Sequence, residues 1–210
     1  MRTSRSGESA LLLIDVVDSL VTQNLEYAVI GALAASVHGA VRASMDADVL
    51  LSIDSQEIKN LESLFEAAGL RTELTRGDFA DPIPGLLKVS DSFGNRVDLL
   101  LGLRGMESQA FSRLVEIPFQ GTTLKFIGRE DFIAMKVFAG GPMDLLDATR
   151  AISAGRTSLD FDLGCIPARG GSERSAHRDS CMTDKDFLSY RRLDPSTSGW
   201  SGSAPRGVRT

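Results

Sequence analysis

Hydrophobic and polar residues follow two different periods along residues 1–152 of the 210-residue chain. Apolar residues recur at helical spacing in some stretches and form short, dense runs in others, which are the patterns of amphipathic helices and of buried strands. Helices are predicted over residues 8–24, 32–38, 56–68, 129–139 and 143–152. Strands are predicted over residues 27–30, 49–53, 86–89, 96–101, 115–119 and 123–127. This order predicts an α+β fold with a small mixed β-sheet and flanking helices.

The composition of the chain changes abruptly after about residue 152. Residues 1–152 carry 14 basic and 21 acidic residues, a net charge of −7, whereas residues 153–210 carry 9 and 7, a net charge of +2. Ser, Gly and Pro make up 20 of these last 58 residues, a share typical of low-complexity chain. We therefore predict one globular domain over residues 1–155 and a poorly structured C-terminal tail over residues 156–210, either disordered or produced by a change of reading frame.

Charge and cysteine content exclude several classes of protein. The net charge of −5 is the opposite of the basic surface that a general DNA-binding protein needs. No apolar run approaches the roughly 18 residues of a membrane span. The two cysteines, Cys165 and Cys181, are too few for a disulfide scaffold, and together with His177 they match no common zinc-site spacing. These features predict a cytoplasmic protein that binds neither membranes nor DNA in general.

The chemistry of the sequence is concentrated in three aspartates. Asp46 and Asp48 are two residues apart at the start of a predicted strand, so their side chains point to the same side of it. Asp98 lies within a second apolar strand, where a lone carboxylate is costly to bury unless it is paired or binds a metal. If the two strands are neighbours, the three carboxylates converge as in a two-metal phosphoryl-transfer site. Like charges this close favour a bound cation, and Mg²⁺ that also holds substrate phosphates suits them best.

Each of these features also has a simpler interpretation. The Asp-x-Asp pair can be a solvated turn, and Asp98 can be an edge-strand charge that resists aggregation. Gly31 follows the predicted strand 27–30, where it either offers backbone N–H groups to a phosphate or only joins strand to helix. His38, at the end of the short helix that follows, is interpreted as a capping or packing residue rather than a base. The occurrence of these features together, in this order, favours the functional interpretation.

The motifs in this order resemble those of the polymerase-β-type nucleotidyltransferase superfamily, over roughly residues 20–152. The resemblance is carried by Ile30-Gly31-Ala32, His38-Gly39, Arg42, Asp46-Ala47-Asp48-Val49-Leu50 and Val97-Asp98-Leu99. The later stretch from Glu130 to Lys136, followed by Asp144-Leu-Leu-Asp147, is similar to the C-terminal Lys…Asp…Asp motif of the AbiEii-like toxin branch.

The resemblance implies roles at the metal and at the acceptor. Asp46 and Asp48 would hold Mg²⁺, which bridges the triphosphate. Asp98 would bind a second metal ion, or orient and deprotonate the acceptor hydroxyl. Asp144 would support the site or activate the acceptor, the alternative being a carboxylate that caps the start of the last helix.

The other matched residues are implied to bind the nucleotide. Gly31 and Ala32 would place backbone N–H groups at the phosphates, and Ala32 stands where the family usually has Gly or Ser. Arg42 and Lys136 would balance phosphate charge as cations. The alternative for Lys136 is a surface lysine whose stem lies along apolar neighbours.

The resulting hypothesis is a Mg-dependent nucleotidyltransferase, which moves a nucleoside monophosphate from an NTP to a hydroxyl on a tRNA, a protein or a small molecule. The toxin branch adds a toxin–antitoxin pair with a cognate antitoxin as partner. Two other hypotheses stay open. One is a catalytically degenerate nucleotidyltransferase fold that acts as a binding or antitoxin-like module. The other is a sugar- or antibiotic-modifying transferase of the same fold.

Overall fold

The computed structural model describes residues 1–53, 55–79, 81–106, 108–155 and 159. The predictions for the tail over residues 156–210, and those for Cys165, His177 and Cys181, lie outside these residues. The division of the chain at residue 155 therefore stays a prediction.

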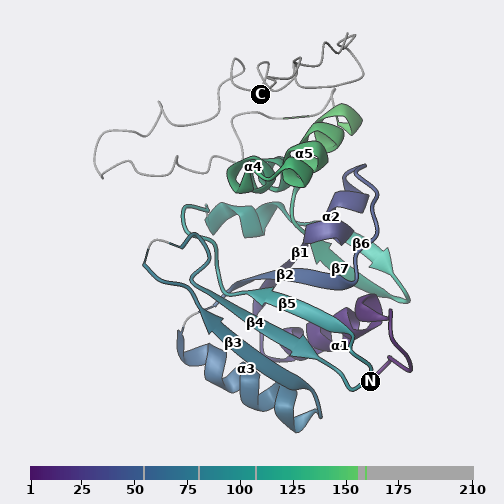
Figure 1. The fold of residues 1–210 in the computed structure, drawn as a ribbon, viewed down its shortest axis with the longest axis vertical. Helices are drawn as coiled ribbons and strands as arrows, with labels where there is room; N and C mark the ends of the chain where they lie inside the picture. Colours follow the sequence, from purple (N-terminus) through teal and green to yellow (C-terminus); the bar gives the residue numbers. More distant parts are fainter. Residues whose placement is uncertain (54, 80, 107, 156–158, 160–210) are drawn as a thin grey trace, which may run out of the picture.

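Within the described residues, seven strands form one mixed sheet (Figure 1). The strands are β1 (Glu26–Ile30), β2 (Asp46–Ser52), β3 (Arg71–Arg76), β4 (Gly85–Ser90), β5 (Arg96–Leu100), β6 (Val115–Phe119) and β7 (Thr122–Phe126). Their order across the sheet is β3-β4-β5-β2-β1-β7-β6. The pairs β2–β5 and β1–β7 are parallel, and the other pairs are antiparallel. The predicted α+β class with a mixed sheet is confirmed.

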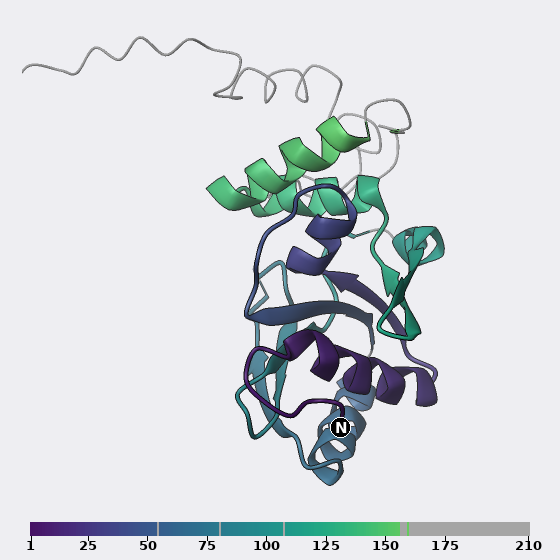
Figure 2. The ribbon, with the colours of Figure 1, turned by 90° about the vertical axis from the view of Figure 1, so that its right-hand side faces the viewer.

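Five α-helices and one 3₁₀ helix accompany the sheet in the described part of the chain. They are α1 (Ser9–Thr22), α2 (Gly31–Val37), α3 (Ser55–Ala67), the 3₁₀ helix η1 (Ser108–Arg113), α4 (Arg129–Ala139) and α5 (Pro142–Ala154). Figures 1 and 2 show α4 and α5 side by side at one end of the molecule, with α1 and α3 towards the other end and the sheet between them. Among the helices described here, none has the length and apolarity that a membrane crossing requires.

The hydrophobic core explains why β2 and β5 form where they do. Ala47, Val49, Val97 and Leu99 alternate with the three aspartates, and each is at most 1% exposed. Because side chains alternate across a strand, the face opposite the aspartates is apolar. Helix α1 packs on β1, β2 and β5, and its fully buried positions include Leu12, Leu13, Val16 and Leu20. Burial of each such side chain stabilises the fold by about 1.5–3 kcal/mol.

Two elements were not predicted from the sequence, and one begins earlier than predicted. Strand β3 is an edge strand with a mostly exposed, polar pattern, so it lacks the apolar alternation on which strand prediction depends; pairing with β4 defines it. The 3₁₀ helix η1 is the second element that was not predicted. Strand β2 begins at Asp46 rather than at residue 49, because pairing with β5 extends to that residue.

Candidate active site

The three predicted aspartates meet on one face of the sheet, where β1 ends and β2 and β5 begin. Strands β2 and β5 are parallel neighbours, and their register places Asp48 beside Asp98 and Asp46 beside Arg96. Neighbouring strands lie about 4.8 Å apart, and residues two apart share a face. The sequence predicted that the three carboxylates converge if the two strands are neighbours. The strands are neighbours, so this condition is met.

Gly31 lies directly against this face, at the junction of β1 and α2. Ile30 pairs with Asp48 across β1 and β2, which brings the first residue of α2 over the carboxylate. A Cβ atom added at Gly31 would lie 1.9 Å from Asp48 Oδ2, and its backbone has φ +63°. Both the close approach and the left-handed conformation require glycine at this position. Ala32, the next residue, is 3% exposed.

Asp48 is the most strongly perturbed carboxyl group of the site. Burial raises its pKa to about 6, and the negative charges of Asp46 and Asp98 add to the effect. The cations Lys136 and Arg42 act in the opposite direction. Both predicted phosphate-binding cations are therefore near enough to Asp48 to influence its ionisation.

The other two carboxylates have different surroundings. The hydroxyl of Ser44 donates a 2.7 Å hydrogen bond to Asp46, which lowers the pKa of Asp46, and Arg96 lowers it further. Burial raises the pKa of Asp98, because its side chain is only 13% exposed, although Arg96 and Lys88 oppose this. The three carboxyl groups therefore differ in their surroundings: the pKa of Asp46 is lowered, whereas the pKa values of Asp48 and Asp98 are raised.

One cation at these carboxylates was not predicted. The Nη2 atom of Arg96 contacts Asp46 Oδ2, and its Nε lies 2.9 Å from Asp98 Oδ1. Arg96 is two residues before Asp98 on β5, so it shares a face with Asp98, and the strand register sets it beside Asp46. The sequence signal was present, because an Arg-x-Asp in a predicted strand places both charges on one side.

Lys136 and Asp144 meet in a second charged cluster on the α4–α5 hairpin. Lys136 Nζ lies 2.7 Å from Asp144 Oδ1 and 3.3 Å from Asp147 Oδ2. Arg42 Nε lies 3.2 Å from the same Asp147 oxygen. Asp147 is fully buried, so this cluster ties the loop that precedes β2 to both helices.

These contacts bear on the alternative interpretations of Lys136 and Asp144. The Lys136 side chain is 13% exposed and ion-paired, so the interpretation as a surface lysine is wrong. Helix α5 has Gly141 at its N-cap position and Asp144 in its first turn, so the interpretation of Asp144 as a carboxylate at the helix start stays open beside its pair with Lys136. Asp147, the last residue of the motif, pairs with both Lys136 and Arg42, which the sequence did not indicate.

His38 is a packing residue, as the sequence indicated. Its side chain is 3% exposed, its Nε2 is 2.8 Å from the carbonyl oxygen of Ile127, and its ring centroid is 5.3 Å from that of Phe132. Burial lowers the pKa of His38. The imidazole therefore joins α2 to the start of α4 instead of facing the carboxylates.

The donor chemistry of the site suits a hard divalent cation, since Asp46, Asp48 and Asp98 offer only carboxylate oxygens. Within the part of the chain that the structure describes, however, no group of three or more His, Cys, Asp or Glu side chains is arranged to hold a metal ion. The guanidinium of Arg96 lies against two of the three carboxylates, those of Asp46 and Asp98. The three carboxylates therefore fit Mg²⁺ by their chemistry. For the ion to bind all three, the guanidinium of Arg96 would have to move away from Asp46 and Asp98.

Sequence comparisons give no family for this chain. No protein-family model matches it, and no curated protein matches it significantly.

Solved structures with the same architecture do exist. The solution structure of the antibiotic-resistance factor ANT(2'')-Ia has a TM-score of 0.51 at 13% identity and covers 69% of this chain and 82% of its own. The crystal structure of ANT(2'')-Ia in complex with adenylyl-2''-tobramycin has a TM-score of 0.50 at 14% identity, with 69% and 87% covered. An antigenic nucleotidyltransferase-like protein from Paracoccidioides brasiliensis has a TM-score of 0.50 at 16% identity, with 92% and 93% covered.

The chain therefore has the fold of the nucleotidyltransferases, which confirms the fold that the sequence resemblance implied. At identities of 13–16%, the likeness establishes the fold and leaves the activity to be argued from the site.

Proposed function

We propose that this protein is a nucleotidyltransferase, which transfers a nucleoside monophosphate from a Mg-NTP to a hydroxyl acceptor and releases pyrophosphate. The observation that carries the proposal is the register of β2 and β5, which sets Asp48 beside Asp98 with Asp46 on the same face. A lone carboxylate pair has simpler explanations. Three carboxylates on adjacent buried strands, one of them with its pKa raised to about 6, favour a site for cations.

The residues divide into those for the metal and those for the acceptor. Asp46 and Asp48 would hold Mg²⁺, which when bound neutralises phosphate charge and orients the triphosphate. Asp98, whose pKa is raised by burial, would bind a second ion or accept the proton of the acceptor hydroxyl. Asp144 would support the acceptor side through its pair with Lys136.

The nucleotide phosphates would lie near the start of α2. The backbone at Gly31 lies against the Asp48 carboxylate, and the charges of Lys136 and Arg42 act on the same carboxylate. These two cations would exchange part of their pairing with Asp144 and Asp147 for phosphate oxygens.

The test is transfer from α-labelled NTPs, each of the four offered with Mg²⁺ and with a tRNA pool, a protein mixture or tobramycin as acceptor. Asp46→Asn and Asp48→Asn are expected to abolish transfer and to leave the fold intact, because each supplies charge rather than packing. Asp18→Asn, which changes a carboxylate that is 52% exposed on α1, is the matched control and should keep the wild-type rate. Transfer at the wild-type rate by either site variant would contradict the metal assignment.

A second candidate function is a degenerate nucleotidyltransferase fold that acts as a binding or antitoxin-like module. The contact of Arg96 with Asp46 and Asp98 favours it, since a permanent guanidinium at this place would exclude a metal ion. Isothermal titration with Mg-ATP separates the two candidates, because a degenerate site binds neither the metal nor the nucleotide.

The acceptor and the biological role form the finer part of the proposal. A small-molecule acceptor is supported by the fold shared with ANT(2'')-Ia, whose crystal structure holds adenylyl-2''-tobramycin. The toxin role rests on the similarity of the Lys136…Asp144…Asp147 series to the motif of the AbiEii-like toxin branch. If the protein is a toxin, its expression should slow growth, Asp48→Asn should relieve this effect, and a cognate antitoxin should suppress it.

A further inference from the structure

Arg96 differs from Arg113, whose ion pair with Asp131 is largely buried. Arg113 makes two hydrogen bonds to Asp131, of 3.0 and 2.7 Å, and the two side chains are only 19% and 5% exposed. Arg96 is 43% exposed, and among the described residues neither its Nε nor Asp98 Oδ1 has a hydrogen-bond partner of good geometry, although the two atoms are 2.9 Å apart. The contact between Arg96 and Asp98 is therefore electrostatic and poorly directed, whereas Nη2 of Arg96 donates a hydrogen bond to Asp46 Oδ2.

The backbone of Arg96, in contrast, is held in place. Its N–H donates a 3.1 Å hydrogen bond to Ser9 Oγ, and that hydroxyl donates a 2.7 Å bond to the carbonyl of Met45, the residue before Asp46. One side chain of α1 thus fixes the starts of β2 and β5 relative to each other.

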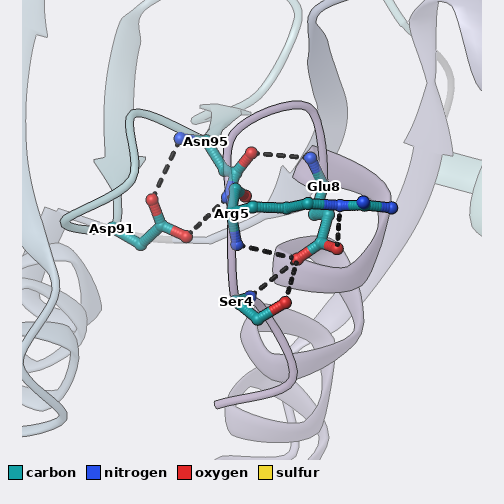
Figure 3. Close-up of polar contacts among 5 residues, drawn as sticks. All are labelled: Ser4, Arg5, Glu8, Asp91 and Asn95. Carbon is teal, nitrogen blue, oxygen red and sulfur yellow. Dashed lines mark hydrogen bonds and ion pairs between the residues drawn. The ribbon is translucent and has the colours of Figure 1, made fainter.

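The turn just before Arg96 is fastened as well (Figure 3). The buried Asn95 accepts a 2.7 Å bond from the Glu8 N–H and donates to the Arg5 carbonyl and to Asp91. Glu8 in turn accepts bonds from Ser4 and Arg5. Because these contacts fix the main chain, a rearrangement of Arg96 on metal binding would involve its side chain, which is 43% exposed.

We propose that Arg96 is a built-in competitor of the divalent metal ion, whose guanidinium neutralises Asp46 and Asp98 in the metal-free protein and must leave them when the metal binds. This inference rests on the proposed function. It makes metal binding conditional on nucleotide, because the ion alone has to displace Arg96, whereas the ion with a triphosphate brings phosphate oxygens that add ligands and can pair with the released guanidinium.

The test is titration of the full chain with Mn²⁺ alone, followed by spectroscopy or calorimetry. Arg96→Gln should bind Mn²⁺ about tenfold more tightly than the wild type, which is about 1.4 kcal/mol. Arg96→Lys keeps the charge and should stay within about twofold of the wild type. Lys88→Gln is the matched control, because Lys88 lies beside Asp98 in the register of β4 and β5 but has its ion pair with Glu73.

The control separates direct displacement from the general effect of removing a positive charge. If Lys88→Gln and Arg96→Gln tighten Mn²⁺ binding equally, or if Arg96→Gln does not tighten it, the inference is wrong. Thermal melting gives a second measurement: Mn²⁺ should raise the melting temperature of Arg96→Gln more than that of the wild type.

Failure of the proposed function has a different signature. Tighter Mn²⁺ binding by Arg96→Gln without any nucleotidyl transfer by the wild type would keep the inference and overturn the function. If the wild type transfers nucleotides but Arg96→Gln binds Mn²⁺ no more tightly, the proposed function would stand and the inference about Arg96 would be overturned.

Discussion

Replacement of Asp48 by asparagine should stabilise the metal-free protein at neutral pH while it removes activity. The carboxyl of Asp48 has its pKa raised from 3.8 to about 6 by burial and by Asp46 and Asp98. Its ionised form is therefore unfavourable in the fold. At about 1.4 kcal/mol for each pH unit, the penalty is at most about 3 kcal/mol when the carboxyl is fully ionised. The asparagine side chain has nearly the same shape and no charge, so the Asp48→Asn variant escapes the penalty.

The sign of the pH dependence follows from linkage. Well below pH 4, Asp48 is protonated in both the folded and the unfolded chain, and it adds no penalty. As the pH rises from about 4 through about 6, the unfolded chain releases this proton first, so the contribution of Asp48 to the stability of the fold falls. The loss is complete only well above pH 6, where the folded chain has also released the proton. The advantage of Asp48→Asn should thus be small at pH 4 and nearly full at pH 7.5.

The assay is thermal unfolding of the wild type and Asp48→Asn in EDTA at pH 4 and at pH 7.5. One kcal/mol shifts the melting temperature of a chain of this size by about 2–4 °C, so a rise of up to about 10 °C is expected at pH 7.5 alone. Asp18→Asn, at an exposed position, should show no such dependence. A variant that is less stable than the wild type at pH 7.5, or equally shifted at both pH values, would refute the reasoning.

Three further results are expected. Gly31→Ala should lower stability more than Gly94→Ala and should abolish Mg-nucleotide binding. Both glycines have positive φ, but a Cβ added at Gly31 would lie 1.9 Å from Asp48 Oδ2, whereas a Cβ added at Gly94 would meet no described atom within 4 Å. Equal losses of stability in urea would contradict this. Asp131→Ala should lower the free energy of unfolding in urea by about 3 kcal/mol, because it removes the carboxylate that pairs with the largely buried guanidinium of Arg113. Asp18→Ala, which breaks an exposed pair with Arg2, should lower it by less than about 1 kcal/mol. From composition, a chain that ends at residue 164 should keep its melting temperature within about 2–4 °C; unfolding of that chain would show that the remaining residues pack on the domain.

The sequence by itself determined most of the elements and the positions of the acidic residues. Apolar spacing located α1, α3, α4 and α5 to within about two residues, because a helix that packs on a core repeats its apolar face every three to four residues. Local rules also placed Asp46 and Asp48 on one side of a strand and Gly31 at the end of another. Each of these conclusions depends only on residues close together in the chain.

Tertiary structure decided what those residues contact. The pairing of β2 with β5 joins residues about 50 positions apart, and no local pattern fixes which strands become neighbours. That pairing brings Asp98 beside Asp48 and sets Arg96 against Asp46. The edge strand β3 was missed for the same reason, since its polar side chains gain order only from hydrogen bonds to β4. The raised pKa of Asp48 likewise depends on burial and on the negative charges of Asp46, on the same strand, and Asp98, on β5. Electrostatic interactions depend on distance in space, so the ionisation of these carboxyl groups depends on the pairing of the strands and cannot be worked out from the sequence alone.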